Sequence, residues 1–133
     1  DYLKMRWKNA IYMVAINEVV YIERDRRKTF VHTMNNEVYS TYMKMNEVIG
    51  TLPNYFLRVH FSYVVNLNFV KEFYRDHVSL YKGQFIPISR TYANIVFICY
   101  FLDLQVHNRY LDYNVLQVHH TMSFHLLFRM RSV

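Results

Sequence analysis

Short apolar runs separated by polar turns dominate the chain up to residue 88. The turns recur at intervals of roughly 8 to 12 residues, which is typical of an all-β or β-rich domain. Residues 2–24 are expected to form two or three strands, with a turn at Lys8-Asn9. The other expected strands are 29–33, 37–42, 55–59, 63–65, 70–74, 78–81 and 84–88.

One short amphipathic helix is expected in the middle of the chain, because apolar residues there recur at i, i+3, i+4 and i+7. Gly50 weakens this helix and Pro53 ends it. A single helical turn is expected at 16–19, and Asn35-Asn36 is expected to form a hairpin turn because Asn tolerates positive φ. The apolar positions of the helix are Met45, Val48, Ile49 and Leu52.

The pattern changes after Ser89, a residue type that can cap a helix. The run 95–98 has no polar face, so an amphipathic surface helix is not predicted there. Residues 103–133 show no clear periodicity. We therefore expect a domain over residues 1–92 and a C-terminal extension over 93–133, whose structure the pattern leaves open.

Composition supports strands, since 53% of the residues are hydrophobic and only two are Gly. The net charge is +6, and residues 1–92 hold 13 Lys and Arg against 8 Asp and Glu. Such an excess attracts phosphate polymers or anionic membranes. A single cysteine, Cys99, allows no disulfide framework and fits a reducing cytoplasm. The longest apolar run, 95–102, is far shorter than the roughly 20 residues of a membrane-spanning helix, so no span is expected.

Motifs for catalysis are absent from the sequence: it has no Gly-rich phosphate loop, no Gly-x-Ser-x-Gly and no His-Glu-x-x-His. We expect neither an enzyme nor a cofactor. Four histidines of the C-terminal part invite a metal hypothesis, but their spacing matches no standard zinc pattern, so no metal site is expected. They are His107, His119, His120 and His125.

Four ordered sequence blocks resemble the LytTR family of bacterial DNA-binding domains. They are Val20-Tyr21-Ile22-Glu23, the helical segment 45–52, Phe56-Leu57-Arg58-Val59-His60-Phe61-Ser62-Tyr63-Val64-Val65-Asn66, and Ile86-Pro87-Ile88-Ser89-Arg90-Thr91-Tyr92. The resemblance implies a mainly β fold with one or two short helices and elongated antiparallel sheets. It further implies loops that enter successive major grooves of double-stranded DNA, and a role in transcription regulation as the output domain of a response regulator.

The resemblance also implies partners and context. Family members are commonly fused behind a phosphorylatable receiver domain, which we expect upstream of Asp1. A homodimer on direct-repeat DNA sites is a further expectation. The competing hypothesis is a protein-interaction or membrane-associated module that uses the aromatic, apolar C-terminal tail.

Two loops in the part of the chain that resembles the family carry cations that are expected to contact DNA. Arg27 falls where family members contact bases, and Arg26 and Lys28 are expected to share that role; the alternative is a solvated turn. Arg90 is expected to bond guanine O6 and N7 bidentately; the alternative is an exposed arginine that begins a helix. Ser89 either donates to a phosphate or caps that helix.

A third loop, at residues 60–62, lies between these two loops in the sequence and departs from the family pattern. Phe61 stands where members usually carry Arg or another polar residue, so it either touches a thymine methyl or packs against protein. Ser62 is expected to contact phosphate. His60 is expected to be a structural residue of the corner, and Asn66 to hold a turn rather than read a base. Glu23 is expected to orient Arg24 or Arg26.

Overall fold

The structure is a computed structural model that describes residues 1–106, with side chains described as far as Ile98. Its helical elements are η1 (Ile16–Glu18), α1 (Met45–Ile49), η2 (Leu67–Phe69) and α2 (Arg90–Val106). Its strands are β1 (Tyr2–Trp7), β2 (Ala10–Ala15), β3 (Val19–Asp25), β4 (Lys28–Thr33), β5 (Val38–Thr41), β6 (Phe56–His60), β7 (Tyr63–Asn66), β8 (Val70–Phe73), β9 (His77–Leu80) and β10 (Phe85–Pro87).

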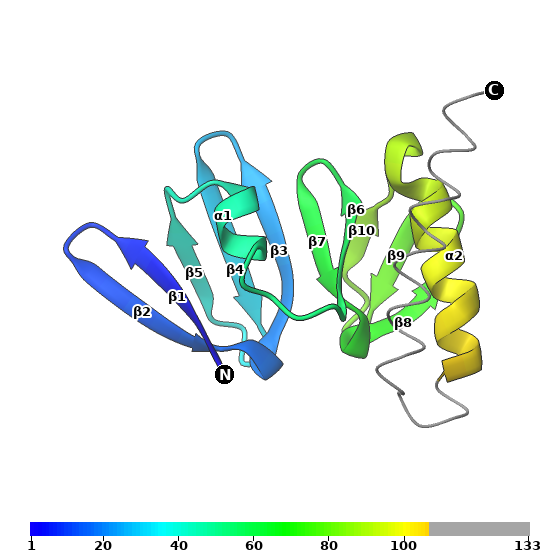
Figure 1. Cartoon of the computed structure of the whole chain (residues 1–133), viewed down its shortest axis with the longest axis horizontal. Helices are drawn as coiled ribbons and strands as arrows, with labels where there is room; N and C mark the ends of the chain where they lie inside the picture. The colour runs from blue at the N-terminus through cyan, green and yellow to red at the C-terminus, as the bar shows by residue number, and fades with distance from the viewer. Residues whose placement is uncertain (107–133) are drawn as a thin grey trace.

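The strands form three antiparallel sheets that lie side by side (Figure 1). A two-stranded sheet β1-β2 is followed by a five-stranded sheet in the order β5-β4-β3-β7-β6 and a three-stranded sheet in the order β10-β9-β8. The expectation of a mainly β fold with antiparallel sheets is confirmed. Every strand expected up to residue 88 is present, with its ends shifted by no more than two residues.

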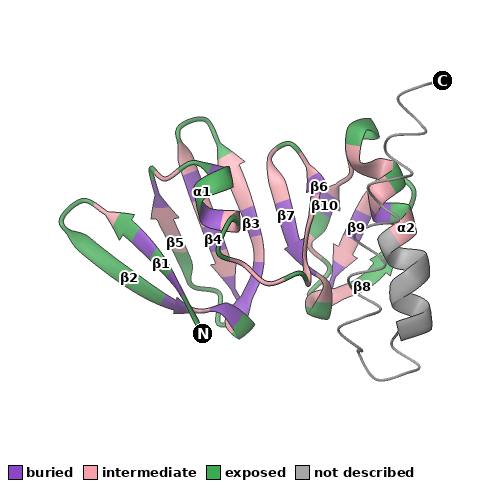
Figure 2. Ribbon diagram, viewed as in Figure 1, coloured by how far each residue is buried: buried purple, intermediate pink, exposed green. Residues whose placement is uncertain are grey.

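The first half of β3 and most of β7 are buried (Figure 2), and both strands supply residues to two cores. One face joins a first core that includes β1, β2 and α1, and the other joins a second core that includes the three-stranded sheet and α2. The first core consists of Leu3, Met5, Val14, Ile16, Val19, Ile22, Val31, Met45, Val48 and Val64. The second consists of Val20, Val59, Val65, Val78, Leu80, Ile86 and Val96.

A β-bulge in β3 decides which residues belong to which core. The register with β4 shifts between Val19 and Tyr21. Residues three apart in a regular strand would face opposite sides, but the extra residue places Val19 and Ile22 in the same core. Val20 is thereby turned to the second core. A single strand thus supplies buried aliphatic side chains to both cores, each side chain contributing about 1.5–3 kcal/mol.

Helix α2 begins at Arg90, as one alternative had it, and continues into the segment whose structure the sequence pattern left open. It runs through the whole apolar run 95–98, where the lack of a polar face argued against a surface helix. Val96 is buried in the second core, whereas Phe97 is 65% exposed. Packing of one face on β6 therefore stabilises the helix, although its exposed positions include the apolar Phe97 as well as the polar Arg90, Thr91 and Asn94. None of the helices within residues 1–106 combines the length and the apolar character needed to cross a membrane.

Candidate nucleic-acid interface

Because neighbouring strands run in opposite directions, one set of the loops that connect the elements lies at the same end of the sheets (Figure 1). We call this the basic end. At the opposite end, two hydrogen bonds link the β9–β10 turn to the β4–β5 turn. Lys82 Nζ donates to Asn36 Oδ1 at 3.1 Å, and Tyr81 Oη donates to the Met34 carbonyl at 3.2 Å. The connections of the basic end are residues 8–9, 26–27, 42–44, 61–62, 74–76 and 88–89.

The first bend, Arg26-Arg27, joins β3 to β4. Both arginines are exposed, and Lys28 at the start of β4 is half-buried. Arg26 has φ 55°, a left-handed conformation that costs a residue with a Cβ about 1–2 kcal/mol. Beneath this bend, the Arg24 guanidinium donates to Thr29 Oγ1 at 2.8 Å and to the Met43 carbonyl at 2.9 Å.

The second bend, Phe61-Ser62, joins β6 to β7. Phe61 is 72% exposed, so its ring is not part of the protein core. The Ser62 backbone N–H donates to His60 Nδ1 at 3.0 Å, and the His60 ring contacts Tyr63 edge-on. His60 is therefore a structural residue of the corner, as the sequence predicted.

The third bend, Ile88-Ser89, leads from β10 into Arg90, the first residue of α2. Arg90 is exposed. Ser89 Oγ is shielded from solvent and makes no hydrogen bond with the described residues, so it does not supply the side-chain cap that its residue type allows. A contact from this oxygen to DNA requires the side chain to rotate.

Two backbone hydrogen bonds hold the three bends together. The Arg24 N–H donates to the Ser62 carbonyl at 2.8 Å, which joins the second bend to the strand that leads into the first. The Ser89 N–H donates to the Val59 carbonyl at 3.0 Å, which joins the third bend to β6. The register of β6 and β7 shifts between Arg58 and His60, so Val59 lies in a bulge and its carbonyl is available to Ser89.

Arg58 is a residue of this interface to which the sequence analysis gave no role. Its guanidinium donates to Asn46 Oδ1 at 2.9 Å and to the Phe61 carbonyl at 2.7 Å. It also lies over the rings of Phe61 and Tyr92, at 5.4 and 5.8 Å from their centroids. Arg58 thus connects α1, the second bend and α2. Its place in the Phe-x-Arg-x-His block was the available signal, but its partners Asn46 and Tyr92 are distant in sequence.

Charge is distributed unevenly between the two ends. The connections at the opposite end carry Glu18, Glu37 and Lys82. The basic end has two acids, Asp25 and Asp76, in or beside its connections. Its cations are Lys8, Arg26, Arg27, Lys28, Lys44, Arg75, Arg90 and, reaching the second bend from β6, Arg58. Clustered cations at one end create a positive potential that attracts phosphate.

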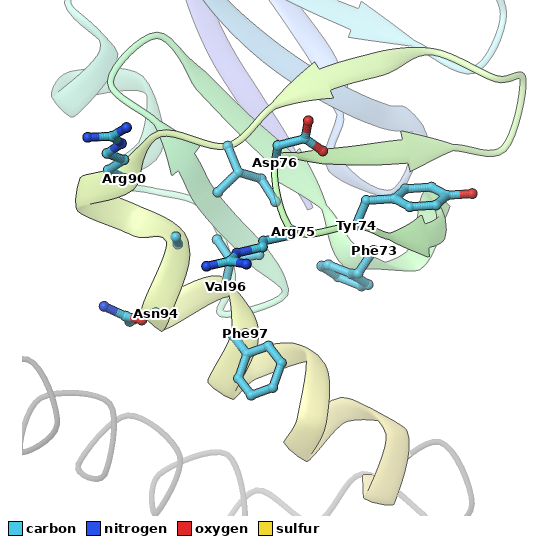
Figure 3. A pocket seen from close by; sticks show the side chains of 10 residues that line it. Phe73, Tyr74, Arg75, Asp76, Arg90, Asn94, Val96 and Phe97 are labelled. Atoms are coloured by element: carbon cyan, nitrogen blue, oxygen red, sulfur yellow. The ribbon is translucent and has the colours of Figure 1, made fainter.

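An open cleft separates the β8–β9 turn from the first turns of α2 (Figure 3). Arg75 points across it toward the helix, whereas Arg90 projects away from it (Figure 3). The His77 ring bonds Asp76 at 2.7 Å, and this hydrogen bond lowers the pKa of the Asp76 carboxyl. Asp76 therefore stays ionised and offsets part of the positive charge of Arg75.

The Glu23 carboxylate has a different partner from the one expected. It bonds His32 Nε2 at 2.7 Å rather than Arg24 or Arg26, and the expectation that it orients one of these arginines is wrong. The reason is register, because β3 and β4 place Glu23 and His32 on the same face. Burial, together with the Glu23 charge, raises the pKa of Tyr63, so the hydroxyl beside the second bend stays neutral.

Asn66 does not face the solvent, and its amide fixes the end of β7. The side chain is fully buried, donates to the Val19 carbonyl at 2.8 Å and accepts from the Asn68 N–H at 2.9 Å. The prediction that Asn66 holds a turn is confirmed.

Other predictions concern residues beyond those described. The histidine cluster 107–125 and most of the C-terminal tail lie outside them, as does the side chain of Cys99. Among the described residues, no three or more His, Cys, Asp or Glu side chains come together in a way that could hold a metal ion.

Comparison with known proteins identifies this arrangement. The family model "LytTr DNA-binding domain" matches residues 9–97. A solved structure of the LytTr DNA-binding domain of a Bacillus cereus response regulator superposes with a TM-score of 0.62 at 26% identity, covering 78% of this chain and 95% of that one.

Similarity to curated relatives supports the same family. The sensory transduction protein LytT of Bacillus cereus is 34% identical over 65% of this chain, and the transcriptional regulatory protein YpdB of Escherichia coli K12 is 38% identical over 54%. The chain spans 37% and 30% of the lengths of these two relatives. By its family match, its fold and its relatives, the chain belongs to the LytTR family of DNA-binding domains.

Proposed function

We propose that this chain binds duplex DNA sequence-specifically by inserting its three bends into major grooves. The observation that carries the proposal is the linkage of the bends at one basic end by the Arg24–Ser62 and Val59–Ser89 hydrogen bonds. Bends held in fixed relative positions can meet a rigid duplex without losing conformational entropy on binding, which favours affinity. Exposed cations at the bends supply the electrostatic part of the binding energy.

The residues are assigned different roles within this proposal. Arg90 and Arg27 read base edges, because an exposed guanidinium can bond guanine O6 and N7 together. Arg26 and Lys28 contact phosphates beside the first bend. The remaining contacts come from Ser62 and Ser89, to phosphate, and from Phe61, whose exposed ring can touch a thymine methyl.

The biological context is also a proposal. Relatives named as transcriptional regulatory or sensory transduction proteins support a role as the DNA-binding part of a longer bacterial response regulator that acts in the cytoplasm. A receiver domain on the same polypeptide would then control binding, and two copies would occupy direct-repeat sites. The DNA-binding role itself requires no catalytic group.

The salt dependence of binding tests the proposal. We expect the affinity for a duplex selected from a random-sequence pool to fall steeply with salt, with a log–log slope of about −0.9 for each phosphate neutralised. The measurement is a fluorescence-anisotropy titration across a range of salt concentrations. A flat response would contradict the proposal and favour the alternative of an apolar docking module.

Replacing Lys28 by alanine is expected to weaken binding to all duplexes by a similar factor. A phosphate contact carries no sequence information, so the salt slope should become shallower by about one unit while base preference is unchanged. Titrations with the selected duplex and an unrelated one provide the measurement. A Lys28→Ala change that altered preference at a single base pair would show that Lys28 reads bases instead.

A further inference from the structure

The β1–β2 turn, Lys8-Asn9, belongs to the basic end but to none of the three bends. It is attached to the five-stranded sheet beside the first bend, since the buried Thr41 hydroxyl donates to the Arg6 carbonyl and accepts from the Met43 N–H. The turn and the first bend therefore keep a fixed separation. A duplex lying along the basic end would reach both.

An aromatic stack lies between this turn and the first bend. The rings of Trp7 and Tyr42 stack with centroids 5.0 Å apart and planes 19° apart. Lys28 Nζ lies 5.1 Å from the Trp7 centroid and 5.8 Å from that of Tyr42, and Lys8 Nζ lies 5.7 Å from that of Trp7. The ring faces attract both ammonium groups and restrict where they lie.

Neither ammonium group is neutralised by a neighbour. Among the described residues, no carboxylate lies within 4.0 Å of Lys8 Nζ or Lys28 Nζ, although Asp25 is the register partner of Lys28 across the first bend. A ring quadrupole orients a cation without cancelling its charge. Two cations that lie near the same Trp7 ring and form no ion pair with the described residues suit neighbouring phosphates of a nucleic-acid backbone.

The backbone of the turn repeats that of the first bend. Lys8 has φ 53° and Arg26 has φ 55°, and each is the first residue of a two-residue turn. Gly or Asn would occupy this left-handed conformation with less strain. The conformation of the turns therefore does not explain why both positions carry a basic residue. An anion that faces both turns would explain it.

We propose that the β1–β2 turn is a fourth DNA contact, in which Lys8 and Lys28, held over the Trp7–Tyr42 stack, bind neighbouring phosphates. The inference rests on the proposed DNA binding and extends it. It adds sequence-independent contacts on the side of the first bend away from α2 (Figure 1). The DNA footprint is accordingly longer than three bends alone require.

The test compares Lys8→Gln with Lys71→Gln, which removes the same charge from an exposed residue near the start of β8. Lys8→Gln should lower the affinity for the selected duplex about five- to tenfold at 0.1 M salt and make the salt slope shallower by about 0.9. Hydroxyl-radical footprinting should show lost protection at one end of the site. Lys8→Arg should restore all three, and Lys71→Gln should leave them at wild-type values.

The outcomes separate the two proposals. If the wild-type chain binds with a steep salt dependence while Lys8→Gln behaves like Lys71→Gln, the fourth contact is refuted and the three bends stand. A wild-type chain without salt-dependent duplex binding refutes the proposed function, and the fourth contact with it. Equal thermal unfolding midpoints for the wild type and Lys8→Gln would attribute a loss of affinity to the missing charge rather than to unfolding.

Discussion

Replacing Arg90 by alanine should weaken binding to the preferred duplex by about 1–3 kcal/mol, which is roughly a 5- to 150-fold loss of affinity. The guanidinium is exposed at the first residue of α2 and points away from the protein, so its removal leaves the protein's own contacts intact. The loss should fall on one base pair. Competition titrations with duplexes that vary each base pair in turn would show preference relaxed at that position alone.

Arg90→Lys is the matched control, because it keeps the charge and loses the bidentate geometry. It should recover most of the salt dependence but not the base preference. A uniform loss of affinity for all duplexes in Arg90→Ala would contradict the assignment, and would place Arg90 among the phosphate contacts.

Replacing Asn66 by alanine should lower the free energy of unfolding by about 2–4 kcal/mol, because one buried and one part-buried backbone group lose their partners. These groups are the Val19 carbonyl, which accepts from the Asn66 amide, and the Asn68 N–H, which donates to it. The first bond links the end of β7 to the start of β3, so its loss weakens the centre of the five-stranded sheet. Urea denaturation followed by circular dichroism measures the effect.

Two variants make this result interpretable. Asn66→Asp keeps the acceptor for the Asn68 N–H but cannot donate to Val19, and it should also destabilise the protein. Asn68→Ala removes an exposed amide while keeping the backbone N–H, so it should change stability by less than about 0.5 kcal/mol. An Asn66→Ala protein as stable as Asn68→Ala would mean that water satisfies both groups.

Together, the Arg90 and Asn66 variants separate recognition from folding. Arg90→Ala should change DNA binding and leave the unfolding curve unchanged. Asn66→Ala should change the unfolding curve and, at temperatures where the protein is folded, leave base preference unchanged. Both residues belong to the sequence blocks that resemble the family, so membership of such a block does not tell which of the two roles a residue has.

The strands were predictable because each is encoded locally. Segments such as 29–33 and 78–81 alternate buried side chains with less buried ones between turn residues, and the strand signal needs no knowledge of distant residues. The turn at Asn35-Asn36 followed from residue type, and Asn36 indeed has φ 62°. Helix α2 could not be predicted in this way, because its run 95–98 has no polar residue and its Val96 packs in a core built from distant strands.

The candidate site was predictable in its residues and not in its geometry. Basic residues at 26–28 and 90 are visible in the sequence, and so is the departure at Phe61. Their assembly depends on the Val59 bulge, on the Arg58 contacts with Asn46 and Tyr92, and on the pairing of β3 with β7. The Arg58 contacts and the β3–β7 pairing join residues that are distant along the chain. The bulge is local to the β6–β7 hairpin, but its carbonyl accepts from the distant Ser89 N–H.

The class of fold, the order of the strands along the chain and the excess of positive charge follow from the residues alone, because all three are sums or periods of local properties. Folding in three dimensions sets which turns share an end, that Glu23 pairs with His32, and that Lys8 lies beside the first bend, because these neighbours are fixed by strand order and by bulges. Strand order and bulges depend on how the two cores pack against the same strands. That packing involves residues far apart in the sequence, so no short segment encodes it.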